Sequence, residues 1–409
     1  MLNSDQIALL RQLAEKYMSY ATLPCQAETK KLWLALNRRE MQKPMVLIDQ
    51  MPWAELEEDA LRCRIDDRYW QWVENWLRRS IYKWEHLPVD MVLPPYILLP
   101  SPFTPFARTA SFGLEVQKKT IGETGAIHAQ EYADVLQEPE DLEKLRPMTV
   151  EEDPNRALHL EEAHRIFDGI APVMESGLTM HLGIWDWVSM ARGVTECYMD
   201  LYDRPEHLHA IMRKLTDCAL DAIDQYNALS AFDTAGTLCH CSHTFCDDLP
   251  HGAGTVTADR AWTFGMAQLF SSVSPEITEE FELPYMKELF ARFGAVYYGC
   301  CERLDDRLEL IDQLPNVRKV SCSPWSDREE FARKLNKKYV MSNKPNPALL
   351  AGPTFEEEAV RADLRRTMQA AKDNGLALEM LLKDISTVKN DPTRLWRWAE
   401  IAAEETANF

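Results

Sequence analysis

The sequence predicts an α/β protein, a (β/α)8 TIM barrel with an N-terminal helical extension and a small β insertion. Eight short apolar runs recur along the chain, and a segment with the pattern of a helix follows each of them. Strands that alternate with helices form parallel βαβ units, because a parallel connection needs a crossover. The chain has 409 residues, a length that barrels of this class reach as one unit. We therefore expect an extension over residues 1–44 and a barrel over residues 45–409.

The extension begins with an amphipathic helix over residues 3–20, whose apolar residues lie at helical spacing. Asn3 and Gln6 are placed for a capping box at its start. A second helical region, residues 54–87, is rich in tryptophan, and we interpret these rings as packing residues. The extension and this region therefore precede most of the barrel.

The apolar runs give the expected strands. They are Met45–Gln50, Met91–Leu99, Thr179–Ile184, Gly236–Ser242, Ala295–Cys300, Val317–Cys322, Tyr339–Lys344 and Leu376–Leu381. Between them, Asp203 with Glu206 and Thr354 with Glu357 fit helix starts, and Gly375 fits a helix end. Residues 101–150 interrupt the alternation with two polar β-like pieces, 111–117 and 127–132, which predict a hairpin insertion.

Charge and motifs exclude several classes of function. The chain carries 45 Lys and Arg against 65 Asp and Glu, a net charge of −20, which disfavours nucleic acid and anionic membrane surfaces as partners. It contains only 15 glycines and neither glycine-rich phosphate-binding string. No apolar stretch is long enough for a membrane helix, and the first residues do not form a secretory signal. We expect a cytoplasmic protein whose ten cysteines are reduced thiols.

In a barrel, catalytic residues lie at the carboxyl ends of the strands, and thiols and imidazoles gather at these expected ends. The metal-ligand candidates are Cys300, Cys301, Cys322 and His240. Thiolate and imidazole ligands suit zinc, and ligands from separate strand ends would form an open, catalytic site. The alternative is that these cysteines fill the core as small apolar residues and that His240 is structural.

Acidic and aromatic residues complete the candidate site. Glu302 would be a costly core residue, so we expect it to act as a zinc ligand or a proton donor, and Asp49 is a second acid–base candidate. The expected substrate contacts are His181, Trp185, Tyr298 and Asp248. For the tryptophan the alternative is packing, and for Asp248 it is a capping turn.

Several segments resemble the uroporphyrinogen decarboxylase superfamily. They are Ala191–Gly193 with Leu201–Leu208, Tyr298–Glu302, Ser321–Trp325 and Ser342–Pro347. The resemblance covers about residue 175 to the C-terminus and implies a (β/α)8 barrel that is either a decarboxylase or a cobalamin-dependent methyltransferase. The decarboxylases carry an arginine-rich stretch near the N-terminus, which residues 33–53 lack.

The methyltransferase branch carries a zinc site built from a His-x-Cys pair and a distant Cys. Here Cys300 matches the cysteine of the pair, Tyr298 stands at the histidine position, and Ser342 lies near the position of the distant cysteine. The resemblance therefore implies zinc held by Cys300, completed by Cys301, Glu302, Cys322 or His240.

The expected function is methyl transfer between a small methoxylated or N-methylated compound and a corrinoid. The chain has no D-x-H-x-x-G string, which supplies the lower cobalt ligand in corrinoid carriers, so the corrinoid is expected on a separate partner protein. Two alternatives stay open: a decarboxylase of a tetrapyrrole-like substrate that uses Asp49, and a non-catalytic corrinoid-binding accessory protein.

Overall fold

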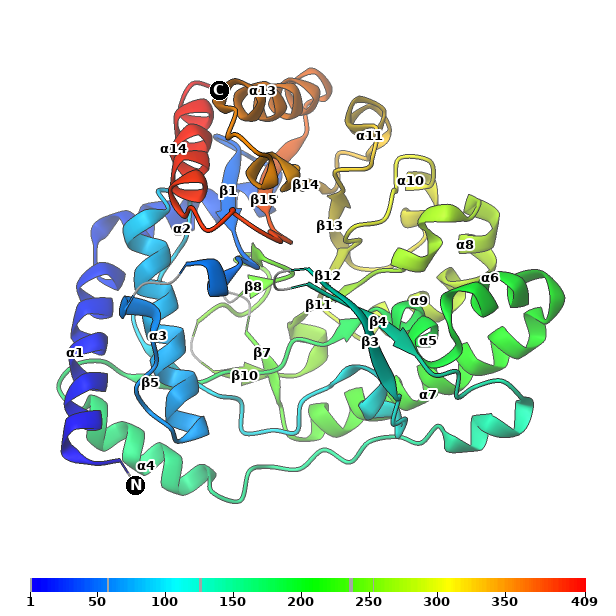
Figure 1. Ribbon diagram of the computed structural model, residues 1–409, viewed down its shortest axis with the longest axis horizontal. Helices are drawn as coiled ribbons and strands as arrows, with labels where there is room; N and C mark the ends of the chain where they lie inside the picture. The colour runs from blue at the N-terminus through cyan, green and yellow to red at the C-terminus, as the bar shows by residue number, and fades with distance from the viewer. Residues whose placement is uncertain (1, 57–58, 125–126, 235–237, 253) are drawn as a thin grey trace.

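A parallel sheet of seven strands forms the centre of the protein, and helices surround it (Figure 1). The structure is a computed structural model that describes residues 2–56, 59–124, 127–234, 238–252 and 254–409. The sheet has the order β1 (Met45–Ile48), β15 (Ala377–Leu382), β14 (Val340–Asn343), β13 (Val317–Cys322), β12 (Ala295–Tyr298), β11 (Trp262–Gly265) and β6 (His181–Leu182).

The first and last strands of the chain are neighbours in this sheet. Ile48 of β1 pairs with Leu382 of β15 in parallel register, so the sheet curls as in a TIM barrel. At the other edge, β6 pairs with β11, and among the described strands no ladder joins β6 back to β1. The predicted α/β fold is confirmed, and it is barrel-like without a closed ring of eight strands.

The helices lie outside the sheet, and those from the N-terminal part of the chain lie together on one side of it (Figure 1). They are α1 (Ser4–Ala21), α2 (Pro24–Asn37), α3 (Arg68–His86), α4 (Arg156–Phe167), α5 (Ile184–Arg192), α6 (Val194–Asp203), α7 (Pro205–Ala228), α8 (Pro275–Phe281), α9 (Leu283–Phe290), α10 (Leu308–Ile311), α11 (Arg328–Lys334), α12 (Ala348–Ala351), α13 (Glu357–Asn374) and α14 (Thr393–Ala407). Within the described residues, none of these helices has the length and apolarity that crossing a bilayer requires.

Several local predictions can be compared with these elements. The capping box of Asn3 and Gln6 is present at α1, and Gly375 ends α13 with a φ of 63°, which a glycine adopts without strain. Asp203 does not cap α7, because it is the last residue of α6 and α7 begins at Pro205.

The remaining strands are short pieces outside the main sheet. β2 (Ile97–Leu99) pairs in parallel with β5 (Val173–Glu175), and β7 (Phe232–Asp233) pairs with β10 (Thr255–Val256). The predicted insertion is a hairpin of β3 (Lys118–Thr124) and β4 (Ile127–Tyr132). Its first arm begins after the predicted 111–117, because residues 108–112 form a 3-10 turn.

The predicted strand Gly236–Ser242 is wrong. Residues 235–237 lie outside the described residues, and the rest forms a hairpin of β8 (Leu238–Cys239) and β9 (Ser242–His243). His240 and Cys241 have φ values of 46° and 67°, which is the geometry of a two-residue turn rather than of a strand. The strand that stands next to β12 is instead β11, which the sequence analysis did not predict.

This hairpin is held inside the curved sheet by a buried ion pair. The ammonium of Lys319 on β13 lies 2.6 Å from Glu379 on β15 and 2.6 Å from the hydroxyl of Ser242. Lys319, Glu379 and Ser242 are fully buried, and a buried charge persists only when it is paired and hydrogen-bonded. The pair therefore joins the hairpin to two strands of the sheet.

Candidate functional site

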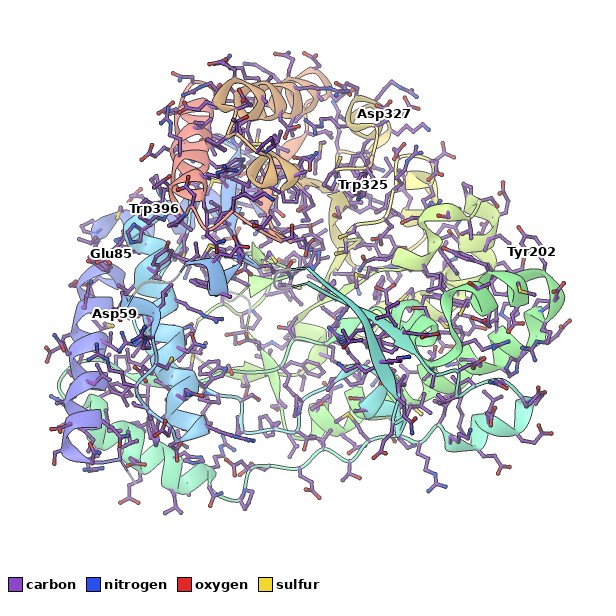
Figure 2. The ribbon with its side chains drawn as sticks, in the orientation of Figure 1. Asp59, Glu85, Tyr202, Trp325, Asp327 and Trp396 are labelled. Atoms are coloured by element: carbon purple, nitrogen blue, oxygen red, sulfur yellow. The ribbon has the colours of Figure 1, made fainter. Side chains whose placement is uncertain are left out.

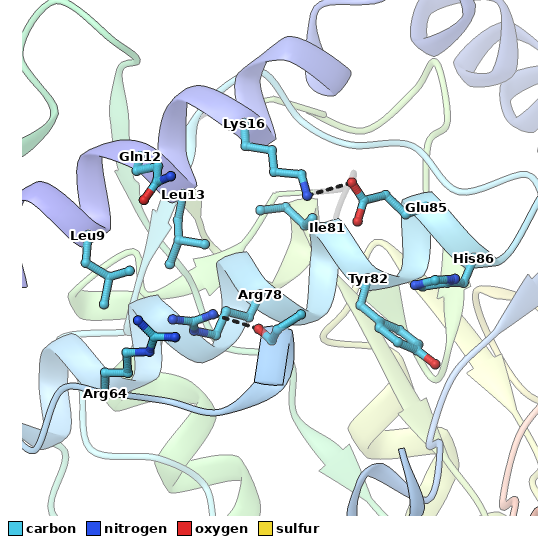
Figure 3. Close-up of a pocket in the computed structure, with 11 residues that line it drawn as sticks. Leu9, Gln12, Leu13, Lys16, Arg64, Arg78, Ile81, Tyr82, Glu85 and His86 are labelled. Atoms are coloured by element: carbon cyan, nitrogen blue, oxygen red, sulfur yellow. Dashed lines mark hydrogen bonds and ion pairs between the residues drawn. The ribbon is translucent and has the colours of Figure 1, made fainter. Parts of the chain in front are cut away.

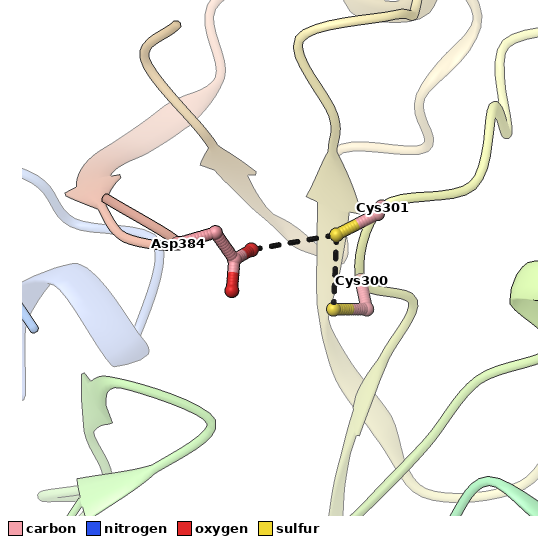
Figure 4. Close-up of side chains that lie close together, drawn as sticks. All are labelled: Cys300, Cys301 and Asp384. Atoms are coloured by element: carbon pink, nitrogen blue, oxygen red, sulfur yellow. Dashed lines mark hydrogen bonds between the residues drawn. The ribbon is translucent and has the colours of Figure 1, made fainter. Parts of the chain in front are cut away.

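Two thiols and a carboxylate meet at the carboxyl ends of β12 and β15 (Figure 4). The sulfur atoms of Cys300 and Cys301 lie 3.5 Å apart, and a carboxylate oxygen of Asp384 lies 3.4 Å from the sulfur of Cys301. In the part of the chain that the structure describes, this is the one group of three potential metal-ligating side chains whose ligand atoms all lie within 4.8 Å of one another. We call these three residues the thiol–carboxylate cluster.

The backbone turns sharply where both strands end. Gly299 follows β12 with a φ of 90°, and a Cβ there would lie 2.6 Å from the side chain of Leu304. Asp384, after β15, has a φ of 54°, which is uncommon for a residue other than glycine. Such conformations concentrate at functional sites, and here they bring the two strand ends together.

The cluster has the spacing of a zinc site. With Zn–S bonds of about 2.3 Å and Zn–O bonds of about 2.1 Å, neighbouring ligand atoms of tetrahedral zinc lie about 3.5–3.8 Å apart. The two separations given above are close to these values. Two thiols and a carboxylate would leave a fourth position open, as in catalytic rather than structural zinc sites.

Lys383 places a positive charge beside the cluster. Its ammonium lies 3.2 Å from the sulfur of Cys300 and 2.9 Å from the carboxylate of Asp384. Donation from the thiol of Cys301 and the charge of Lys383 lower the pKa of Cys300 against the effect of burial. The same sulfur–sulfur contact and burial raise the pKa of Cys301. Cys300 is therefore the thiol that ionises first.

A second buried lysine lies inside the barrel near the carboxyl ends of the strands, which we call the mouth of the barrel. The ammonium of Lys344 donates to the hydroxyl of Tyr297 and lies 3.1 Å from that of Ser342. Burial, together with the charge of Lys383, lowers the pKa of Lys344 to about 8. This lysine therefore holds a proton that it can release near neutral pH.

Glu302 does not join the thiol–carboxylate cluster. One of its carboxylate oxygens accepts the backbone N–H of Cys300 at 2.8 Å, and the other accepts that of Ala267 at 3.2 Å. These bonds join the segments that follow β12 and β11, and they explain how a carboxylate is tolerated at 3% exposure. This geometry fits a positioning residue, and the predicted role as a proton donor stays a prediction.

Three buried or half-buried carboxyl groups, Asp186, Glu282 and Glu302, form an acidic group behind the mouth. Burial and the neighbouring Glu302 raise the pKa of Asp186 to about 7. Burial raises the pKa of Glu282 to about 8, although the Tyr298 hydroxyl donates to its carboxylate at 2.9 Å. Tyr298 is therefore bound to this group, on the outer face of β12, and not to the thiol–carboxylate cluster.

Asp49 lies at the end of β1, one strand away from the cluster. Its backbone N–H donates to the carbonyl of Leu382 at 3.0 Å, so Asp49 is the neighbour of Lys383 across the sheet. Its carboxylate pairs with the ammonium of Lys83 at 2.6 Å, and this contact lowers its pKa against the effect of burial. Asp49 also lines a pocket of about 410 Å³ between α1, α3 and β2.

The two candidate histidines lie together and are not members of the thiol–carboxylate cluster. The rings of His181 and His240 both stack on Phe264, each with 4.3 Å between ring centres. Burial lowers the pKa of His181 to about 4 and that of His240 well below its usual value. Both imidazoles are therefore neutral, and neither belongs to the thiol–carboxylate cluster.

Three further candidates lie elsewhere. Cys322 is fully buried among apolar side chains on the outer face of β13, because its position in the strand alternates with the inward-facing Ser321. Trp185 packs in α5 and donates to the carbonyl of Phe281 at 3.0 Å. Asp248 pairs at 2.7 Å with Arg318, near the amino end of β13, which is the end opposite the cluster. None of these three residues belongs to the thiol–carboxylate cluster, and their predicted roles in metal or substrate binding stay predictions.

A second pocket, of about 270 Å³, lies between α1 and α3 (Figure 3). Two of its cationic groups are paired: Lys16 with Glu85 at 2.7 Å, and Arg78 with Glu74 at 2.8 Å. It is lined by residues of the helices and of the segment between them, and no strand-end residue of the main sheet contributes to it. This pocket is therefore not part of the site at the barrel mouth.

Asp384 is a possible ligand that the sequence pattern did not predict. The signal was present, since Lys383 and Asp384 directly follow an apolar run, and polar residues at that position lie at the catalytic end of a barrel. All ten cysteines are free thiols in the structure, as predicted.

No protein-family model matches the chain, and no curated protein matches it either. Among solved structures, the chain is similar to a methyltransferase from Methanosarcina mazei, with a TM-score of 0.51 and 12% sequence identity. The match covers 93% of this chain and 98% of that protein. At this identity the likeness concerns the fold, and it extends over nearly the whole of both chains.

Proposed function

We propose that the protein is a methyltransferase that binds zinc at the thiol–carboxylate cluster and exchanges a methyl group with a corrinoid on a separate protein. The spacing of Cys300, Cys301 and Asp384 at the catalytic end of the sheet carries this proposal. The similar fold of the Methanosarcina mazei methyltransferase and the resemblance of the Cys300 segment to the methyltransferase branch support it.

The chain's own residues would prepare the site for this reaction. Lys383 favours the thiolate of Cys300, which is the form that binds metal. Zinc held by Cys300, Cys301 and Asp384 would act as a Lewis acid toward the heteroatom of a small substrate. When the methyl group departs, that heteroatom keeps the bonding electron pair and takes up a proton, and Lys344 is a proton source of suitable pKa.

The partner would approach over the same mouth. Trp325, in the loop after β13, is 74% exposed (Figure 2). Large exposed aromatic side chains are enriched at the centres of protein interfaces. We assign Trp325 to the contact with the corrinoid protein.

Metal content tests the proposal directly. The purified protein should hold one zinc ion per chain, and Cys300→Ser, Cys301→Ser and Asp384→Asn should each lose most of it. Cys25→Ser, on the exposed start of α2, is the matched control and should keep its zinc. The zinc-loaded protein should demethylate a member of a methoxylated or N-methylated panel when a reduced corrinoid protein is added.

A second candidate function is decarboxylation, which rests on the position of Asp49 in the wall of the larger pocket. It predicts a metal-free protein whose turnover of a carboxylated tetrapyrrole is lost in Asp49→Asn. A metal-free protein with neither activity would contradict both enzymes and leave the accessory role.

A further inference from the structure

The larger pocket has walls made of aromatic rings. Tyr17, Trp53, Trp76 and Tyr96 are among the residues that line its volume of about 410 Å³, which lies within the range of small-molecule sites, about 300–1,000 Å³. The rings of Tyr17 and Trp76 pack with their centres 4.9 Å apart, and the Tyr17 hydroxyl donates to the carbonyl of Pro94 at 2.8 Å. The wall between α1 and α3 is therefore held in a fixed shape.

One cation in this pocket, Arg79, forms no ion pair with a described carboxylate, and the nearby Asp49 is paired with Lys83. The guanidinium of Arg79 lies 4.5 Å from the centre of the Trp53 ring, and none of the described carboxylates forms an ion pair with it. The neighbouring Arg78 is paired with Glu74, and Lys83, in the same pocket, is paired with Asp49. Among the described lining residues, the pocket therefore has one positive charge in excess.

We propose that this pocket binds a planar aromatic carboxylate, with the ring between the aromatic walls and the carboxylate on the guanidinium of Arg79. A guanidinium offers two parallel N–H groups to a carboxylate, and the Arg79 guanidinium, which lies over the Trp53 ring, forms no ion pair with a described carboxylate that would occupy them. Aromatic walls favour a flat ring, because offset and edge contacts between rings add to the burial of apolar surface.

The pocket lies beside the proposed catalytic centre. Asp49 lines it and is the neighbour of Lys383 across β1 and β15, and Lys383 contacts the thiol–carboxylate cluster. That the bound molecule is the methyl donor rests on the proposed function. The binding itself does not.

Calorimetry on the full-length protein tests the binding with benzoate and benzamide, which have nearly the same shape and differ in charge. Benzoate should bind at least about tenfold more tightly than benzamide, the size of one charge-assisted hydrogen bond. Arg79→Gln should remove that preference and leave benzamide binding unchanged. Arg68→Gln, on the exposed first turn of the same helix, should behave as the wild type.

Replacing Arg79 leaves no described carboxylate unpaired, so the variant is expected to fold, and its thermal unfolding checks this. Equal affinity for the two compounds, absent benzoate binding, or an unchanged preference in Arg79→Gln would each overturn the proposal. The assay needs neither zinc nor a corrinoid protein. A negative result with an intact zinc site therefore refutes the pocket alone, and a metal-free protein that binds benzoate refutes the proposed function alone.

Discussion

The ammonium of Lys383 and the thiol of Cys300 face each other at 3.2 Å, and both side chains are at most 5% exposed. They follow β15 and β12, respectively, and are 83 residues apart in the chain. In such a buried place the attraction between an ammonium and a thiolate is stronger than in water. Together with donation from the thiol of Cys301, the charge of Lys383 therefore favours the thiolate form of Cys300.

Lys383→Met should raise the pKa of Cys300 and slow its alkylation at pH 7 several-fold, because the thiolate loses its neighbouring positive charge. The rate of iodoacetamide modification at Cys300 between pH 6 and pH 10, resolved by tandem mass spectrometry, measures this effect. Lys337→Met, at an exposed lysine, is the control and should keep the wild-type profile. An unchanged profile in Lys383→Met would show that Cys301 alone lowers the pKa.

Glu302→Gln should lower the free energy of unfolding by about 1–3 kcal/mol, the usual cost of leaving a buried group unsatisfied. Both carboxylate oxygens accept backbone N–H groups, and the amide nitrogen of glutamine cannot accept one of them. Urea unfolding of this variant and of Glu309→Gln, at an exposed position, checks the prediction. Equal stability of the two variants would contradict the positioning role and favour a direct catalytic role for Glu302.

The acidic group should make the protein less stable as the pH rises from about 5 to 8. The pKa of Asp186, about 7, and that of Glu282, about 8, lie above the values of an unfolded chain. The folded state therefore binds more protons than the unfolded state in this window, and stability is lost as these groups ionise. Glu282→Gln should flatten the dependence, whereas Glu280→Gln, at an exposed position, should not. Urea titrations at pH 5, 6, 7 and 8 compare the slopes, and parallel slopes would contradict the assignment.

Trp325→Ala should raise the concentration of corrinoid protein needed for half-maximal transfer by about tenfold, because a buried aromatic contact at an interface contributes 1–2 kcal/mol or more. Its zinc content should stay that of the wild type. Tyr202 is 75% exposed on α6 (Figure 2), and Tyr202→Ala is the matched control. Equal behaviour of the two variants would place the partner elsewhere.

The apolar pattern predicted most of the sheet, because strands buried on both faces read as apolar runs. β13 has the predicted bounds, Val317–Cys322, and β14 and β15 differ from prediction by one residue at each end. The pattern failed at β11, since Trp262–Gly265 is only four residues long and ends in glycine, a weak signal for a strand. It also failed at the β8–β9 hairpin, whose Cys239 packs inside the barrel without belonging to its sheet.

For the site, the sequence placed Cys300 and Cys301 at a strand end, and the structure adds Asp384 from a segment 83 residues away. These side chains meet because β12, β13, β14 and β15 are successive neighbours in the sheet. Local sequence patterns do not show which strands are neighbours. Cys322 shows the reverse case. It ends a correctly predicted strand, yet the period of two in a strand turns its side chain to the outer face.

The hairpin that Lys319 and Glu379 hold inside the barrel also decides how molecules reach its centre. Cys239 and Phe245 pack there with Met45 and Ala295, two residues at the amino ends of their strands. Within the described residues, these side chains fill the barrel at its amino end, whereas Asp384 of the thiol–carboxylate cluster is exposed at the carboxyl end. Under the proposed function, the small molecule and the protein partner both approach this carboxyl end. The small molecule then has to bind first, and the larger partner covers it. Saturating concentrations of the partner would then slow the turnover, because a partner that binds first blocks the entry of the small molecule.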